Sequence, residues 1–151
     1  MKLLKNIFYI SLPIILGTII GIITQNNSNF DSLIKPPLTP PPIIFIIVWS
    51  ILYILIGISY FLFKKNSYND KLETLIYYLQ LFVNLTWSIL FFTLKQRFIS
   101  IIWLLILIIL IYLLISLFKQ KNKTSSILLI PYLIWCIFAT YLNIGIYLLN
   151  L

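Results

Sequence analysis

Five apolar runs, each about twenty residues long, occupy most of this chain: 7–24, 43–63, 74–94, 99–118 and 127–149. A helix needs roughly 20 apolar residues to cross a hydrocarbon core about 30 Å thick, so each run is long enough to span a membrane once. Because 62% of the 151 residues are hydrophobic and 9% are charged, no stretch is left for a soluble domain. The sequence therefore predicts an all-α membrane protein, a single domain over 1–151 built as one bundle of five transmembrane helices.

The chain has a net charge of +8, and its basic residues are distributed unequally between the two ends of the apolar runs. Three basic residues lie on the side of the Pro-rich loop, at Lys35, Lys95 and Arg97. The other basic residues flank the opposite ends of the runs: Lys2, Lys5, Lys64, Lys65, Lys71, Lys119, Lys121 and Lys123. Cytoplasmic loops carry the excess of basic residues, so we expect the N-terminus and the loops between spans two and three and between spans four and five to be cytoplasmic. The Pro-rich loop and the C-terminus then lie on the opposite side. The basic residues contact lipid headgroups in this arrangement, and a nucleic-acid partner is not expected.

Ionisable side chains are absent from the middle of every run. The chain has no histidine, and its acids are Asp31, Asp70 and Glu73. A carboxylate proton relay, a metal site and a Ser-His-Asp arrangement each need groups that are missing here. We therefore expect no catalytic residue, no metal and no cofactor, and ion-coupled transport is disfavoured. The sequence Asp70-Lys-Leu-Glu73 has the form of a capping box for the third helix.

Aromatic and amide residues recur at helical spacing in three of the runs. Trp49, Tyr53, Gly57 and Tyr60 share one face of the second run, Gln80, Asn84, Trp87 and Phe91 share one in the third, and Trp135, Ala139, Leu142, Asn143 and Ile146 share one in the fifth. Such faces could line a pocket for a flat aromatic ligand. They could equally fill the core, with the amides bonding across helices. Periodicity alone leaves both readings open.

Two further patterns concern packing. Gly17-Thr-Ile-Ile-Gly21 allows a close approach of helices, either inside the bundle or across a homodimer. The fourth run, 99–118, carries few polar residues and is expected to be the helix most exposed to lipid. The loop 25–42 contains Lys35-Pro-Pro-Leu-Thr-Pro-Pro-Pro42, which is predicted to be extended and stiff.

The order and the residues of these segments resemble those of one known family. Leu33-Ile-Lys-Pro-Pro-Leu-Thr-Pro-Pro-Pro-Ile-Ile-Phe45, Val48-Trp-Ser-Ile-Leu-Tyr53, Gln80-Leu-Phe-Val-Asn-Leu-Thr-Trp87 and Pro131-Tyr-Leu-Ile-Trp-Cys-Ile-Phe-Ala-Thr-Tyr-Leu-Asn143 together resemble the TspO/MBR family of tryptophan-rich sensory and translocator proteins. The resemblance implies an often dimeric bundle that binds porphyrins or other hydrophobic molecules in a pocket closed by the first loop. It implies ligand-binding roles for Trp49, Tyr53, Asn84, Trp87, Trp135, Ala139 and Leu142, and a lid that includes Lys35, Pro36, Pro40 and Pro41.

The chain departs from the family pattern in the lid. The aromatic positions around the Lys-Pro element are here Asn29 with Phe30, Leu38 and Ile43, and Ile46-Ile47 replaces a Gly-Pro pair. We therefore expect a receptor or carrier for a porphyrin-like ligand. A porphyrin-degrading or porphyrin-modifying enzyme is a weaker alternative, because relatives with such proposed activity rely on loop tryptophans. A structural or assembly role without a small ligand is a third reading.

Overall fold

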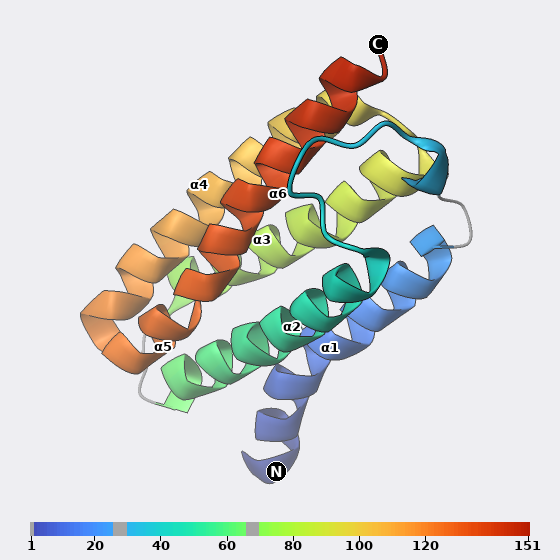
Figure 1. Ribbon diagram of the computed structural model, residues 1–151. Helices are drawn as coiled ribbons and strands as arrows, with labels where there is room; N and C mark the ends of the chain where they lie inside the picture. Colours follow the sequence, from blue (N-terminus) through green and yellow to red (C-terminus); the bar gives the residue numbers. More distant parts are fainter. Residues whose placement is uncertain (1, 26–29, 66–69) are drawn as a thin grey trace.

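The computed structural model describes residues 2–25, 30–65 and 70–151, and these ranges contain helices and no strand. Figure 1 shows the long helices side by side, with the N-terminus and the C-terminus at opposite ends of the bundle. The α-helices are α1 (Lys2–Gln25), α2 (Pro42–Lys65), α3 (Lys71–Ser88), α4 (Arg97–Lys121), α5 (Lys123–Leu128) and α6 (Ile130–Leu149). Two short segments, a 3₁₀ turn η1 (Phe30–Ser32) and a π-helical turn η2 (Ile89–Thr93), complete the fold.

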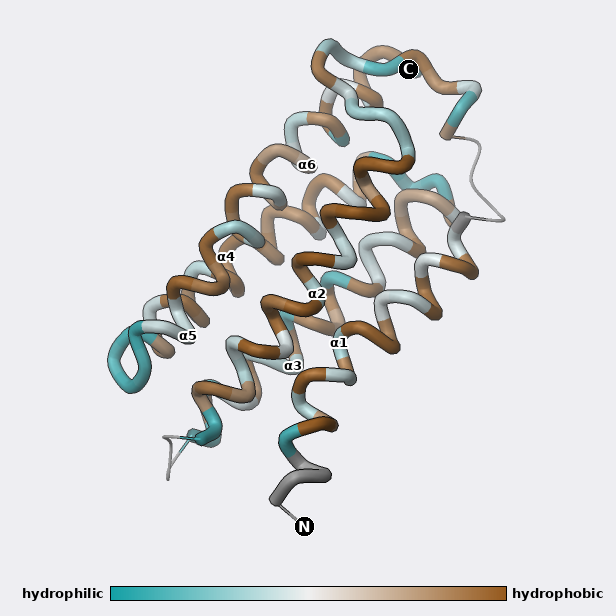
Figure 2. The backbone as a smooth tube through the Cα atoms, turned by 60° about the horizontal axis from the view of Figure 1, so that its bottom comes forward, coloured by the Kyte–Doolittle hydropathy of each residue, from teal (hydrophilic) through white to brown (hydrophobic). Residues whose placement is uncertain are grey.

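Five stretches are long and apolar enough to cross a membrane: Asn6–Thr24, Pro42–Lys65, Lys71–Thr93, Arg97–Lys121 and Lys123–Leu149. They overlap the five predicted runs, so the prediction of an all-α bundle with five membrane-spanning segments is confirmed. Figure 2 shows hydrophobic residues along the helices and hydrophilic residues gathered at the turns between them. This distribution is what a bundle crossing a bilayer requires, since only the ends of its helices meet water.

The third span ends in a π-helical turn that the sequence analysis did not predict. The Leu94 N–H donates to the Ile89 carbonyl at 2.9 Å, five residues back, and the Gln96 N–H donates to the Leu90 carbonyl at 2.9 Å. A π turn holds more residues than an α turn and so rotates the side chains that follow. Phe92 lies within this turn.

The fifth span divides into α5 and α6 around Leu129, where the prediction had a continuous helix over 127–149. Pro131 has no N–H to donate to the Ile127 carbonyl, so the regular bonding pattern is interrupted. The Leu129 N–H bonds instead to the Ser126 carbonyl at 3.2 Å, and the regular pattern resumes when Leu133 donates to Leu129 at 3.1 Å. The span is therefore two helices joined end to end.

The predicted capping box at the start of α3 is wrong. Asp70 precedes the helix, but its side chain makes no capping hydrogen bond. Its carboxylate instead accepts from Lys64 Nζ at the end of α2, and Glu73 pairs with Lys121 at the end of α4. Each acid thus meets a lysine on a neighbouring helix, and the two ion pairs hold three helix ends together.

The expectation that the fourth span is the most lipid-exposed is also wrong. Only 17% of the apolar window in α1 is buried, against 33% in α4. The leucines and isoleucines of α4 pack against α3 and α6 along one face that includes Leu104, Leu107, Ile111 and Leu114. In contrast, α1 lies at the edge of the bundle and packs mainly on α2. A scarcity of polar residues therefore does not show which helix is most exposed to lipid.

Candidate functional site

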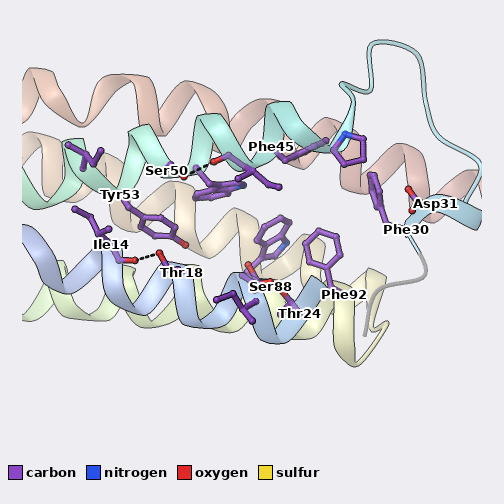
Figure 3. Close-up of a pocket in the computed structure, with 18 residues that line it drawn as sticks. Ile14, Thr18, Thr24, Phe30, Asp31, Phe45, Ser50, Tyr53, Ser88 and Phe92 are labelled. Atoms are coloured by element: carbon purple, nitrogen blue, oxygen red, sulfur yellow. Dashed lines mark hydrogen bonds between the residues drawn. The ribbon is translucent and has the colours of Figure 1, made fainter. Parts of the chain in front are cut away.

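A cavity of about 680 Å³ lies between α1, α2 and α3, and η1 and the start of α2 border one end of it. Figure 3 shows α1 and α2 on opposite sides of this cavity. Its lining residues are Ile14, Gly17, Thr18, Gly21, Ile22, Thr24, Phe30, Asp31, Pro42, Phe45, Ile46, Trp49, Ser50, Tyr53, Ile54, Trp87, Ser88 and Phe92. The volume falls within the range of roughly 300–1,000 Å³ that small-molecule sites occupy. We call this cavity the main pocket.

Three aromatic residues singled out from the sequence meet in the main pocket. Trp49 and Tyr53 are one helical turn apart on α2, which places them on the same face, and their ring centroids are 5.7 Å apart. Trp87 reaches the same place from α3, with its ring 6.0 Å from that of Trp49 and tilted by 32°. Two faces predicted separately thus converge, because α2 and α3 bring their aromatic stripes together.

Three phenylalanines at the loop end of the pocket were missed by the sequence analysis. Phe30 of η1 makes edge-on contacts with Phe45 of α2 and with Phe92 of η2, each with ring centroids 5.9 Å apart. Phe45 could have been found, because it precedes Trp49 by one turn and continues the same stripe. Phe92 follows Trp87 by five residues, off the face that Trp87 marks, so the aromatic stripe of the third run did not indicate it. We call Phe30, Phe45 and Phe92 the phenylalanine wall.

A second, much smaller cavity of about 20 Å³ lies on the other side of this wall. It is lined by the three wall residues and by Trp87, Phe91, Ala139, Leu142, Asn143 and Ile146. Ala139 and Leu142 are buried and face this small cavity, not the main pocket. The wall therefore separates the α2 and α3 residues implied by the family resemblance from those on α6.

Trp135 lies behind the wall and lines neither cavity. Its ring packs edge-on against Phe45 with centroids 5.8 Å apart, and against Phe138 at 5.4 Å. Its indole Nε1 is buried and has no hydrogen-bond partner. In this structure Trp135 supports the wall from α6 instead of contacting the main pocket.

Asn84 lies beneath the pocket and is fully buried. Its Oδ1 accepts from the hydroxyl of Tyr53 at 2.8 Å, and its Nδ2 donates to the hydroxyl of Tyr132 at 2.6 Å. Tyr132 in turn donates to Oε1 of Gln80 at 3.0 Å. The amides thus bond across helices, as one of the two readings proposed, and Asn84 orients Tyr53 without lining the pocket itself.

The two glycines of the first span have different surroundings, since Gly17 is buried and Gly21 is exposed. A methyl group on Gly17 would collide with the ring of Tyr53, so the glycine makes room for that side chain. A methyl group on Gly21 would meet no atom within 4 Å, because Gly21 borders the open pocket. Close packing of α1 on α2 continues at Gly57, which lies against the backbone of Ile10.

The Pro-rich loop is anchored to α6 at three points. The side chain of Asn150, just beyond α6, accepts from the Ile34 N–H at 3.0 Å and donates to the Ile34 carbonyl at 2.8 Å. Pro36 is buried against Gly145, where a larger residue would clash with its ring. The Tyr141 hydroxyl donates to the Pro37 carbonyl at 2.9 Å. In Figure 1 the loop accordingly runs across the C-terminal half of α6 before it enters α2.

The remaining loop residues named from the sequence lie around this anchor. Lys35 Nζ lies 4.9 Å from the centre of the Phe30 ring and donates to the main-chain carbonyl of Asp31 at 3.3 Å. Pro40 is half-buried and Pro41 exposed at the entry to α2. Asn29, named above as a departure from the family, lies outside the described residues, as does the rest of 26–29. The loop thus places Phe30 and Asp31 at the pocket while its proline section rests on α6.

The residues that line the main pocket can interact with a ligand mainly through their aromatic faces. Within the described residues, no group of three or more His, Cys, Asp or Glu side chains lies close enough to hold a metal ion. Among the described residues that line the main pocket, Asp31 carries the only formal charge. The arrangement suits binding of a flat apolar molecule more than acid–base chemistry.

Fold and pocket together define a class: a helical membrane protein with an aromatic-lined cavity between its first three spans and a first loop that is anchored on the last span. The model of the TspO/MBR family matches residues 9–149, nearly the whole chain. The chain belongs to the TspO/MBR family and is an integral, multi-pass membrane protein.

Several members of this family are similar over most of their length. The tryptophan-rich protein TspO of Archaeoglobus fulgidus is 40% identical over 117 residues, which cover 77% of this chain and 76% of the relative. The protein of the same name from Chlorobaculum tepidum is 36% identical, with coverage of 80% and 78%. A translocator protein homolog of Schizosaccharomyces pombe is 31% identical over 152 residues, with coverage of 97% and 93%.

Proposed function

We propose that this protein is a membrane receptor or carrier that binds a hydrophobic aromatic ligand of the porphyrin class in the main pocket. One observation carries the proposal: Trp49, Tyr53 and Trp87 converge on a cavity of about 680 Å³ that lies among membrane-spanning helices. A flat macrocycle gains most from broad aromatic faces and needs few directional contacts. Two relatives are named as translocator proteins, which agrees with a carrier role.

The proposal assigns different parts to the residues implied by the resemblance. Trp49 and Trp87 stack on the ligand, and Asn84 acts through Tyr53. Ala139, Leu142 and Trp135 come into contact with the ligand only if the phenylalanine wall moves aside. The loop with Lys35, Pro36, Pro40 and Pro41 acts as the lid, since it carries Phe30 to the end of the pocket and rests on α6.

Titration with protoporphyrin IX in detergent tests this function. We expect saturable quenching of tryptophan fluorescence, with a Kd that rises at least about tenfold in Trp87→Leu, because that change removes one of the two tryptophan rings that line the main pocket. Trp103→Leu is the matched control: Trp103 lines neither cavity and donates from α4 to Thr86 at 2.8 Å. Quenching no greater than that of an unrelated helical membrane protein would refute the proposal.

The same preparation distinguishes binding from chemistry. If the protein only binds the porphyrin, the absorption spectrum after illumination and removal of the protein should match that of porphyrin treated alone. A new product spectrum that depends on Trp87 would instead support the enzymatic alternative.

We also propose the orientation predicted from the basic residues, with the N-terminus cytoplasmic and the lid on the opposite side. Single cysteines at Leu38, which is 80% exposed in the lid, and at Lys123, the first residue of α5, test it in a background in which Cys136 is replaced by Ala. A membrane-impermeant thiol reagent applied to intact cells should label the first and not the second. Labelling of position 123 alone would show that the orientation is the opposite of the one proposed.

A further inference from the structure

We propose that the main pocket selects against negatively charged ligands, so that it takes a planar aromatic macrocycle whose peripheral acid groups are neutral, as esters are, in preference to the free diacid. This inference rests on the proposed function and narrows its ligand class. It makes Asp31 a specificity-determining residue at the loop end of the pocket.

The charge distribution around the pocket is the first support. Asp31 is the charged residue among those that line the cavity, and its carboxylate lies beside Phe30 at the loop end (Figure 3). Neither a lysine nor an arginine is part of the lining. A ligand carboxylate at this end would therefore approach a fixed negative charge without a positive partner in the pocket wall.

The nearby lysine does not supply that partner in this structure. Lys35 Nζ lies over the ring of Phe30 and donates to the main-chain carbonyl of Asp31 at 3.3 Å. Both contacts keep the ammonium group on the loop, beside the phenylalanine that borders the cavity. A ligand acid would have to replace them before it could pair with Lys35.

The polar groups that line the main pocket are the second support, because they are neutral and most of them already make hydrogen bonds within the protein. The hydroxyls of Thr18 and Ser50 each donate to a carbonyl of their own helix at 2.8 Å, and the hydroxyl of Tyr53 donates to Asn84. In contrast, Nε1 of Trp87 is buried and has no acceptor. An indole N–H is a neutral donor that suits a carbonyl or ring nitrogen, and a ligand that supplied one would satisfy a group now unpaired.

The test compares protoporphyrin IX with its dimethyl ester in wild type, Asp31→Asn and Asp70→Asn. Both variants change the net charge equally. However, Asp70 is not part of the pocket lining and pairs with Lys64 at the end of α2. Because an ester also enters detergent micelles more readily, the informative quantity is the ratio of the two Kd values in each protein. We expect Asp31→Asn to shift this ratio about fivefold in favour of the diacid, as removal of one nearby like charge implies. The ratio in Asp70→Asn should equal that of wild type.

The outcomes separate this inference from the function on which it rests. If both porphyrins quench saturably and the Kd ratio is the same in wild type and Asp31→Asn, the charge selection is wrong and the binding function stands. A ratio that shifts equally in Asp70→Asn would also overturn it, because the effect would then come from net charge. If neither porphyrin binds to any of the proteins, the proposed function fails and this inference fails with it.

Discussion

The ring of Tyr53 lies directly against the backbone of Gly17, so that α1 and α2 approach each other where the main pocket begins. Tyr53 is 8% exposed and holds this position through its hydroxyl bond to Asn84. The glycine pattern of the first span is thus explained at one of its two positions by packing inside the bundle. The other position, Gly21, borders empty space.

Gly17→Ala should destabilise the protein, because the added methyl group would overlap the Tyr53 ring. Overpacking of this kind costs about 1–3 kcal/mol. Thermal unfolding in detergent, followed by circular dichroism, should therefore show a lower midpoint. Gly21→Ala is the matched control on the same helix and should unfold like wild type. Equal midpoints for the two variants would contradict the close contact between Gly17 and Tyr53.

Gly21→Leu should fill the pocket without disturbing the fold. Gly21 has no neighbour within 4 Å of an added Cβ, so a larger side chain has room to enter the cavity and occupy ligand space. We expect porphyrin affinity to fall at least about tenfold, which is roughly 1.4 kcal/mol. Ile19→Phe adds bulk to the same helix at an exposed position outside the pocket lining and should keep its affinity. Unchanged binding by Gly21→Leu would show that the ligand lies elsewhere.

Asn84→Leu should lower stability and also disturb Tyr53. The change removes the acceptor of the Tyr53 hydroxyl and the amide that donates to the Tyr132 hydroxyl, which keeps its bond to Gln80. Interhelical bonds of this kind are each worth about 1 kcal/mol in a membrane. Chemical unfolding in mixed micelles should give a loss of about 1–2 kcal/mol. The double variant Tyr53→Phe/Asn84→Leu should lose less than the sum of the single losses. Strict additivity would mean that the bond contributes nothing.

Loosening the lid should speed up ligand exchange. Tyr141→Phe removes the bond to Pro37, and Asn150→Leu removes both bonds to Ile34. Two exposed hydrogen bonds at the low end of the usual range, about 0.5 kcal/mol each, correspond to about a fivefold change. Stopped-flow quenching should therefore give association and dissociation rates for Asn150→Leu raised by about that factor. Tyr147→Phe, also on α6, removes a hydroxyl that does not contact the loop and serves as control. Rates equal to wild type in Asn150→Leu would indicate that the ligand enters by another route.

Much of the fold could be predicted because a bilayer restricts the possibilities so strongly. Each membrane-spanning run must satisfy its backbone internally, so length and hydropathy are enough to locate the helices. The same reasoning failed at α3 and at α5, where η2 and Pro131 alter the helical register. Hydropathy also misjudged how much of α4 and α1 faces lipid. A leucine that packs on another helix has the same hydropathy as a leucine that faces lipid.

The site was predictable only along single helices. Trp49 and Tyr53 share a face whatever lies opposite them, since their spacing alone decides it. Whether Ala139 and Leu142 join that face depends on α6, which the phenylalanine wall now separates from the main pocket. Asp31 was visible in the sequence only as one of three acids, and its place at the pocket depends on the path of the loop.

The sequence by itself thus determined the helices, their number across the membrane and the aromatic stripe of each, because these depend on backbone satisfaction in lipid and on a period of 3.6 residues. Only the tertiary structure decided which stripes meet, where the cavity opens and which charge borders it. The reason is that helices in a membrane associate through shape and a few hydrogen bonds, such as those of Asn84, and not through an apolar pattern that could be read from one helix alone.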